Sequence, residues 1–349
     1  MTNTNTKTLS KTDAKYDWIK LILSLGILAI HAKVYPMVLF PWLRLAVPLF
    51  FIISSYFLFS KLQTVAPEEQ KTVVKRFVIR NARLYACWLV ILLPVTLYVR
   101  KDTFLAGSIG KSIVATLKSL FFGSTFIASW FLPAIILGVV IIYGLSKLLR
   151  KDFPVFLVAL FAFVIVTLTS SYSSVIADTF LSAAIIQYLK VFGGLVCSFP
   201  AALLWVFVGK MFAEHKIRIQ SLGLLIALTI CSCVALFAEW RFVISLDGSY
   251  HNDSYFMLAP LGILLFQWIQ RIKPLDWSRS VYVRHASTIL YVTHGSVVII
   301  VNKALSVVLG TAAPLLTFAV TLVGCMALYA LIEWLIAKWP KNKLLTWLY

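Results

Sequence analysis

Long apolar stretches recur along the whole chain and are separated by short polar breaks. A helix needs about 17–25 mostly apolar residues to cross a hydrocarbon core roughly 30 Å thick, and these stretches are of that length. The sequence therefore predicts an all-α integral membrane protein of about ten transmembrane helices. We place them at residues 17–35, 42–60, 84–100, 130–147, 154–170, 189–209, 221–238, 254–270, 286–304 and 314–337.

The composition agrees with this class of protein. Of the 349 residues, 61% are hydrophobic and 13% are charged, whereas a soluble domain of this size carries about 25% charged residues. No region is both long and polar enough to fold as a separate soluble domain. We predict one transmembrane domain at 16–338, preceded by a polar cytoplasmic segment, 1–15, and followed by a short cytoplasmic tail, 339–349.

The net charge of +19 is distributed unevenly between the loops. If the N-terminus is cytoplasmic, the inside segments hold 23 of the 32 Lys and Arg residues, as the positive-inside rule requires. We therefore expect a multi-pass protein of the cell membrane, surrounded by lipids, with both termini cytoplasmic and no bound nucleic acid. Segment 100–129 places four basic residues on the outer side, and we interpret it as an interfacial or re-entrant helix.

Several signatures of catalytic and metal sites are missing. All five cysteines lie in apolar runs, and none has zinc-ligand spacing with a histidine, so we expect no metal. There is no G-x-S-x-G nucleophile motif, no Walker-type phosphate loop and no H-E-x-x-H. Direct transfer assisted by a general base is therefore preferred to a covalent serine mechanism.

The first span contains three ionisable side chains. Such groups cost about 2.5–3.5 kcal/mol within a membrane on insertion scales and are functional candidates. Asp17 and Lys20 lie at one end, and His31 follows eleven residues after Lys20, about 16 Å along a helix axis. A neutral imidazole is a natural general base for activating a hydroxyl. The alternative is an interfacial histidine that bonds a neighbouring helix.

The second span contains Pro48 and the pair Ser54 and Ser55. Proline frees a backbone carbonyl, and serine can bond back to its own helix or across to another. We expect a kinked helix, and a kink that opens a cavity.

Three arginines, Arg76, Arg80 and Arg83, occupy the following inside loop. Arg80 and Arg83 share one face of a helix, and the guanidinium fork fits phosphate oxygens. The alternative is a basic flank that only fixes topology. In the later spans His294 and Glu333 are ionisable, and each is also compatible with a structural hydrogen-bonding role.

At these residues the sequence resembles acyltransferase family 3, the polytopic membrane O-acyltransferases that modify surface sugars. The resemblance covers residues 16–337 and implies a fold of about ten helices around a central cavity. The blocks that carry it are Asp17-x-x-Lys20 with His31, Arg44-Leu-Ala-Val-Pro-Leu-Phe-Phe-Ile-Ile-Ser-Ser-Tyr, Arg80-x-x-Arg83, Ser129-Trp-Phe-Leu-Pro133, and Ile289-Leu-Tyr-Val-Thr-His294.

The resemblance also implies roles for individual residues. His31 matches the catalytic histidine of the family, and Lys20 stands where arginine is usual, so it keeps the charge and loses the fork. We group Asp17 with these two as catalytic. Arg80 and Arg83 match the arginine pair associated with acyl-CoA, and we group Arg76 with them. We assign the acceptor substrate to Arg44, Trp130, His294 and Glu333.

Two positions depart from the family pattern. Ser55 replaces the usual glycine of the second block, and Ser129 stands where a histidine often precedes the tryptophan.

Our main hypothesis is a membrane O-acyltransferase, specifically an O-acetyltransferase, that uses cytoplasmic acetyl-CoA or another acyl-CoA. The acceptor would be a hydroxyl of a lipid-linked or cell-surface glycan. The alternative is a membrane carrier or substrate-binding domain for a small molecule such as an amino acid, similar to the membrane half of the serine racemases of vancomycin resistance. An acyltransferase consumes acetyl-CoA and a carrier does not. A sensor without chemistry would need a soluble output domain.

Overall fold

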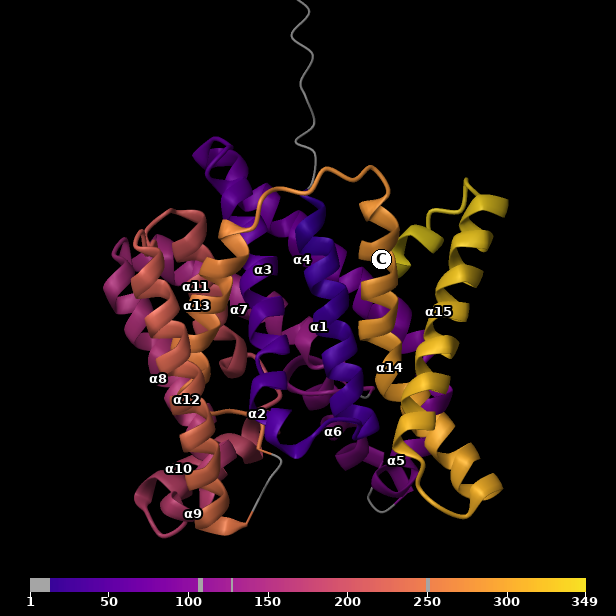
Figure 1. Cartoon of the computed structure of the whole chain (residues 1–349). Helices are drawn as coiled ribbons and strands as arrows, with labels where there is room; N and C mark the ends of the chain where they lie inside the picture. Colours follow the sequence, from indigo (N-terminus) through magenta and orange to yellow (C-terminus); the bar gives the residue numbers. More distant parts are fainter. Residues whose placement is uncertain (1–12, 106–108, 127, 249–251) are drawn as a thin grey trace, which may run out of the picture.

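The computed structural model describes residues 13–105, 109–126, 128–248 and 252–349. Within these ranges the regular elements are helices, and no strand occurs. Most of the predicted polar segment 1–15 lies outside the described residues. The helices are α1 Ala14–Ala32, α2 Phe40–Leu43, α3 Ala46–Leu62, α4 Pro67–Ile91, α5 Leu93–Leu105, α6 Ile109–Phe122, α7 Phe131–Leu149, α8 Asp152–Ser171, α9 Ser173–Ile176, α10 Phe180–Phe192, α11 Pro200–Ala213, α12 Leu222–Asp247, α13 Leu258–Arg271, α14 Ser280–Leu309 and α15 Pro314–Lys338 (Figure 1).

The structure confirms an all-α, multi-pass membrane protein. Six helical segments of the described chain are long and apolar enough to cross a membrane: Met37–Leu62, Phe131–Leu149, Asp152–Ser171, Leu222–Leu246, Ser280–Leu309 and Pro314–Lys338. The helix pair α4 and α5, bent by 65°, would make a seventh span. The first helix, α1, has 19 residues but carries Lys15, Asp17 and Lys20 in its first two turns. The predicted count of ten is not confirmed.

Two predicted spans are not continuous helices. The prediction of one helix over 189–209 is wrong, because α10 ends at Gly193, whose φ is +85°, and Pro200 opens α11. The predicted span 84–100 consists of the last third of α4 together with part of α5. Pro94 lies just after the bend between them and has no N–H to continue the helix.

The second predicted span changes its hydrogen bonding near its start but continues as one helical segment, Met37–Leu62. Pro48 cannot donate to the carbonyl of Arg44 four residues earlier. The α-helical hydrogen-bond pattern stops for two residues between α2 and α3, at Arg44 and Leu45, although both keep right-handed helical φ and ψ. Further along, the Ser55 hydroxyl bonds back to the carbonyl of Phe51 at 2.7 Å. The kink predicted at Pro48 stays a prediction.

The basic loops gather at one end of the bundle, which we call the N-terminal end. The N–H of Ala14 donates to the carbonyl of Leu275 at 2.9 Å, which joins α1 to the loop before α14. One cavity joins the start of α4 to the ends of α7 and α11, and a second joins the segment after α11 to the end of α13. The segments predicted to share one side of the membrane therefore meet.

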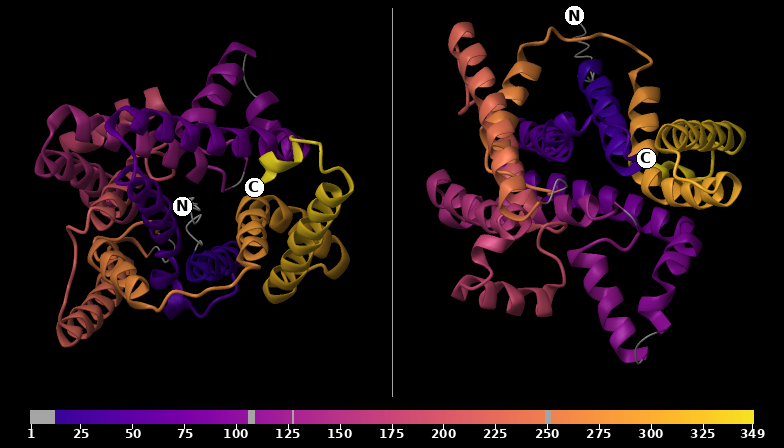
Figure 2. Two further views of the ribbon diagram at one scale, coloured as in Figure 1. Left: turned by 90° about the horizontal axis from the view of Figure 1, so that it is seen from above. Right: turned by 60° about the horizontal axis from the view of Figure 1, so that its bottom comes forward.

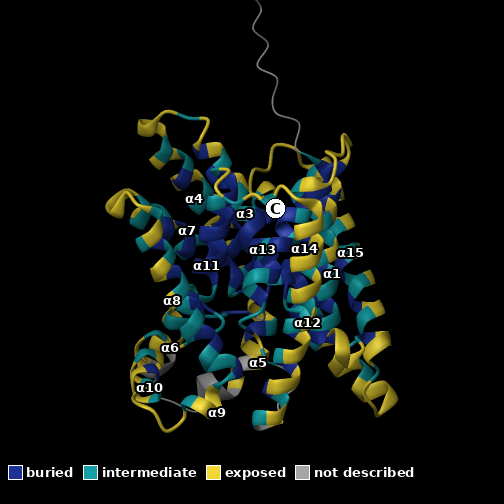
Figure 3. Cartoon of the chain, turned by 60° about the vertical axis from the view of Figure 1, so that its left-hand side comes forward, coloured by how far each residue is buried: buried dark blue, intermediate teal, exposed yellow. Residues whose placement is uncertain are grey.

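Viewed along the bundle, the helices form a ring rather than layers (Figure 2). Buried residues concentrate around α3, α7, α11 and α13, while many residues of the outer helices are exposed (Figure 3). Helix α11 is buried on nearly all sides and packs against α3, α7 and α8. A helix that is mostly apolar and covered by its neighbours on nearly all sides is expected in the core of such a protein.

The closest approach of α3 and α11 depends on a glycine. A Cβ on Gly209 would overlap the hydroxyl of Ser55 and would lie 2.7 Å from the carbonyl oxygen of Ile52. Small residues let membrane helices approach closely. Ser55, which replaces the usual family glycine, therefore faces a glycine on the partner helix.

We predict that Gly209→Ala destabilises the protein by about 1–3 kcal/mol, because a backbone carbonyl blocks the new methyl group. The measurement is thermal unfolding of the purified protein in detergent. The matched control is Gly144→Ala in α7, where no atom lies within 4 Å of the added Cβ. Equal melting temperatures for the two variants would contradict this packing.

Candidate active site

A cavity of about 240 Å³ lies at the far end of α1, and its wall is built both from helices and from segments where helices are interrupted. His31 comes from the last turn of α1, and Arg44 from the break between α2 and α3. Trp130 comes from the segment between α6 and α7, Cys197 from the break between α10 and α11, and Asp253 from the segment before α13. Non-helical backbone is tolerated in a membrane protein where it lines a cavity.

Two histidines meet beside this cavity. The ring centroids of His31 and His294 are 4.9 Å apart. His31 is exposed and lines the cavity, whereas His294 is 0% exposed. His294 Nδ1 lies 2.7 Å from the carbonyl oxygen of Tyr291 and 3.1 Å from that of Leu290. A carbonyl oxygen only accepts, so Nδ1 carries a proton.

The tautomer of His294 follows from these bonds. In a neutral imidazole with a proton on Nδ1, Nε2 holds a lone pair. Nε2 of His294 is buried and has no hydrogen-bond partner among the described residues. The lone pair is therefore available to a donor from the neighbouring His31 ring.

Opposite charges lie on the wall of the same cavity. Arg44 Nη1 pairs with Asp253 Oδ1 at 2.8 Å, and the Arg44 guanidinium lies 4.4 Å from the centre of the Phe40 ring. The Asp253 segment is fixed from two sides: Ser170 Oγ accepts the N–H of Asp253 at 2.9 Å, and Glu239 accepts two backbone N–H groups at the start of α13. The Asp253 carboxylate is 48% exposed and can contact a bound molecule.

The other charged residues of α1 lie far from His31. Asp17 is fourteen residues before His31, about 21 Å along the helix. Both oxygens of Asp17 accept from Arg284 of α14, at 2.9 and 3.0 Å. Lys20 interacts electrostatically with Asp17, Arg284 and Arg80. The structure thus brings three of the sequence-predicted residues, Asp17, Lys20 and Arg80, together with Arg284. We call these four residues the cation cluster.

Arg83 and Glu333 contact the C-terminal segment. The Arg83 guanidinium lies 4.9 Å from the Trp347 ring. Glu333 accepts the hydroxyl of Tyr349 at 2.8 Å and pairs with His285 at 2.8 Å. Burial and the bond to Glu333 raise the pKa of Tyr349.

Further contacts hold the same segment against the bundle. The His285 ring stacks on Tyr349 with a centroid separation of 3.7 Å. Trp88 Nε1 donates to the carbonyl of Leu348 at 3.2 Å. Arg76 is exposed on α4.

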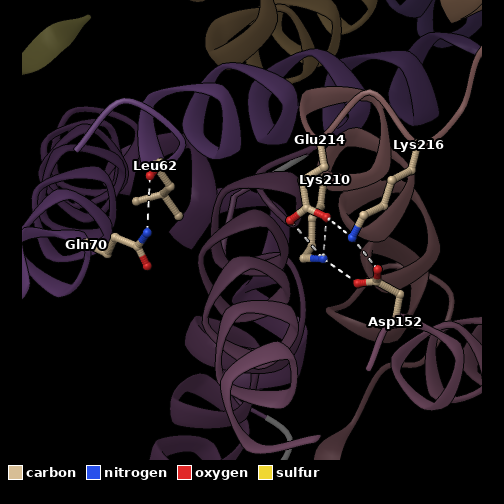
Figure 4. Close-up of polar contacts among 6 residues, drawn as sticks. All are labelled: Leu62, Gln70, Asp152, Lys210, Glu214 and Lys216. Carbon is tan, nitrogen blue, oxygen red and sulfur yellow. Dashed lines mark hydrogen bonds and ion pairs between the residues drawn. The ribbon is translucent and has the colours of Figure 1, made fainter. Parts of the chain in front are cut away.

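A larger cavity, of about 610 Å³, opens at the N-terminal end. Its wall carries a closed network in which Lys210 pairs with Asp152 at 2.6 Å and with Glu214 at 3.0 Å, and Lys216 pairs with the same two carboxylates (Figure 4). The bonds to Asp152 and Glu214 raise the pKa of Lys216. Two lysines balance two carboxylates, so this network joins α8 to α11 without excess charge.

Of the ten residues selected from sequence, the structure brings His31, Arg44, Trp130 and His294 together. Sequence reasoning missed Asp253 and Tyr291 at the cavity and Arg284 in the cation cluster. Of these three residues, Tyr291 alone could have been found from the sequence, because it lies in the same family block as His294, three residues earlier. Asp253 and Arg284 lie in loops or at a helix start, where a charge carries no local signal.

These features define a multi-pass membrane protein. One cavity contains the histidine pair and the ion pair of Arg44 and Asp253, and the cation cluster lies at the opposite end of α1. The family model described as an acyltransferase domain, that of acyltransferase family 3, matches residues 13–332, nearly the whole chain. The chain belongs to this family and is a membrane acyltransferase. No curated protein and no solved structure gives a significant match.

We predict that Arg83→Ala loosens the C-terminal segment, because Trp347 loses a cation–π contact of about 0.5–1 kcal/mol. Amide hydrogen exchange over residues 343–349 should accelerate roughly two- to fivefold. Arg76→Ala, on the same helix, is the control and should leave this exchange unchanged. Identical exchange in the wild type and in Arg83→Ala would show that the tail does not depend on Arg83.

Proposed function

We propose that the protein is an O-acyltransferase of the cell membrane. It moves an acyl group, specifically acetyl, from acyl-CoA to a hydroxyl of a lipid-linked or cell-surface glycan. The observation that carries the proposal is the contact of His31 with His294 in a cavity that also holds the pair Arg44 and Asp253. This cavity then combines three elements: His31 as the base, His294 as the partner of that base, and polar side chains that can bind a hydroxylated acceptor.

His31 is the general base in this proposal. The structure places the two rings next to each other without a hydrogen bond between them. In the proposed reaction an N–H of the His31 ring would turn to donate to the lone pair of His294 Nε2, which would fix the ring and leave the other nitrogen of His31 as an acceptor. His294 is a positioning residue, since its own Nδ1 is bonded within α14. In many enzymes a second group orients the catalytic base. Here both the base and the group that orients it would be histidines.

The chemical step then needs no covalent enzyme intermediate. The free nitrogen of His31 takes the proton of the acceptor hydroxyl as its oxygen attacks the thioester carbonyl carbon. A C–O bond forms, the C–S bond breaks, and the CoA thiolate leaves with the electron pair of that bond. The proton passes from His31 to the thiolate, so the products are an ester and free CoA.

The acceptor side suits one sugar ring. The cavity of about 240 Å³ is smaller than typical pockets for drug-sized ligands. Trp130, Phe51 and Tyr291 line it with aromatic rings, and the exposed carboxylate of Asp253 can accept hydrogen bonds from neighbouring hydroxyls. We therefore assign Arg44, Asp253 and Trp130 to the acceptor.

The donor side is the N-terminal end of the bundle. Lys20 and Arg80 supply positive charge there, and Lys20 lies about 16 Å from His31 along α1. A CoA whose phosphates rest on these residues can extend its long pantetheine arm toward the cavity. Because the basic loops meet at this end, we place it, with both termini, in the cytoplasm.

The test of the proposed function is acetyl transfer by the purified protein in nanodiscs, supplied with acetyl-CoA and an extract of lipid-linked glycans. His31→Ala and His31→Gln should each lower the transfer rate by about 10²–10⁴-fold while acetyl-CoA binding is kept. Glutamine forms hydrogen bonds but cannot take a proton at neutral pH, so it separates a base from a packing partner.

The matched control is His215→Gln, an exposed histidine at the other end of the bundle, which should keep full activity. Near-normal transfer by His31→Gln would refute the general-base role. A wild-type protein that never releases CoA from acetyl-CoA, and instead equilibrates a small molecule across vesicles, would replace the enzyme with a carrier.

A further inference from the structure

The ion pair between α1 and α14 leaves part of its arginine free. Arg284 uses Nε and Nη2 to hold the two oxygens of Asp17. Asp17 is 7% exposed, whereas Arg284 is 39% exposed. Among the described residues no hydrogen bond to Nη1 of Arg284 is seen, and the partial exposure of the side chain leaves room for a further partner.

The surroundings of this pair carry an excess of positive charge. Lys20 interacts electrostatically with Arg284 and Arg80, and Arg80 with Arg284. Asp17 is the one carboxylate that these interactions include. Like charges that interact in this way repel one another, and a bound anion would relieve that repulsion. The network of Lys210 and Lys216 differs, because its own carboxylates neutralise it.

We infer that Arg284, with Lys20 and Arg80, forms a three-cation site for the phosphate groups of the acyl-CoA donor. Asp17 is a positioning residue that sets the orientation of the Arg284 fork. This inference rests on the proposed function and deepens it. It also changes the sequence-based assignment, since Arg284 takes the place that was given to Arg83, whose guanidinium lies against Trp347.

The chemistry of the three side chains fits phosphate. A guanidinium contacts phosphate oxygens through paired N–H donors, and an ammonium acts as a compact point charge. The three groups come from α1, α4 and α14, so a bound phosphate would join three separate helices. An arginine already held by a carboxylate loses less side-chain freedom when it binds a ligand.

The experiment compares two donors that differ in their phosphates. Acetyl-CoA carries all of them, and S-acetyl-pantetheine carries none. Arg284→Ala should weaken acetyl-CoA binding about ten- to hundredfold and should leave S-acetyl-pantetheine binding unchanged. Arg284→Lys should recover only part of the loss, because the fork is missing. Arg279→Ala, an exposed arginine at the start of the same helix, is the matched control and should bind both donors normally.

A charge swap separates a ligand contact from a structural one. Asp17→Arg combined with Arg284→Asp keeps an ion pair between α1 and α14 but moves its cation onto the other helix. If the pair only joins the two helices, the swapped protein should regain both thermal stability and acetyl-CoA affinity. Our inference requires that stability returns and affinity does not. Where Arg284→Ala fails to fold, the swap and Arg284→Lys still decide the question.

The failure of this inference is distinct from that of the proposed function. Normal acetyl-CoA binding in folded Arg284→Ala would overturn the inference, as would an equal loss for both donors. If the wild-type protein binds neither donor, the proposed function itself fails.

Discussion

The demand of the membrane that every backbone polar group be satisfied shapes this protein more than any other constraint. Regular helices meet it within themselves, and breaks are tolerated where they are covered by protein or line a cavity. The chain is interrupted between α2 and α3, between α6 and α7, between α10 and α11, and before α13. Residues from all four interruptions line the cavity that contains His31. The irregular segments thus contribute Arg44, Trp130 and Asp253 to the site, while His31 and Tyr291 come from the helices α1 and α14.

Helix α1 connects the two halves of the proposed reaction. Its first turns carry Asp17 and Lys20 within the cation cluster, and its last turn carries His31. The helix is fixed at one end by the ion pair to Arg284 and at the other by the contact with His294, and both partners belong to α14. In the proposed reaction, this pair of helices would set the distance between the donor phosphates and the reacting carbon. Such positioning contributes much of the rate gain in group transfer.

Much of the fold could be predicted from the sequence because lipid-facing helices must be long and apolar. The family blocks also identified His31, Arg44, Trp130 and His294, which the structure brings together. Hydropathy failed over 189–209, because an apolar run does not reveal that Gly193 ends one helix before Pro200 begins another. Asp253 and Arg284 could not be predicted, because their roles come from partners 209 and 267 positions away in the chain. The sequence also could not predict that Arg80 lies in the cation cluster while Arg83 contacts Trp347.

The most direct test is an electron cryomicroscopy structure with an acetyl-CoA analogue in which a methylene group replaces the thioester sulfur. This analogue keeps the carbonyl but cannot transfer the acyl group. Our account predicts phosphate density in contact with Lys20, Arg80 and Arg284, and the ketone carbon in the cavity beside His31. Phosphates bound instead in the cavity next to Lys210 and Asp152, or a ketone far from His31, would contradict it.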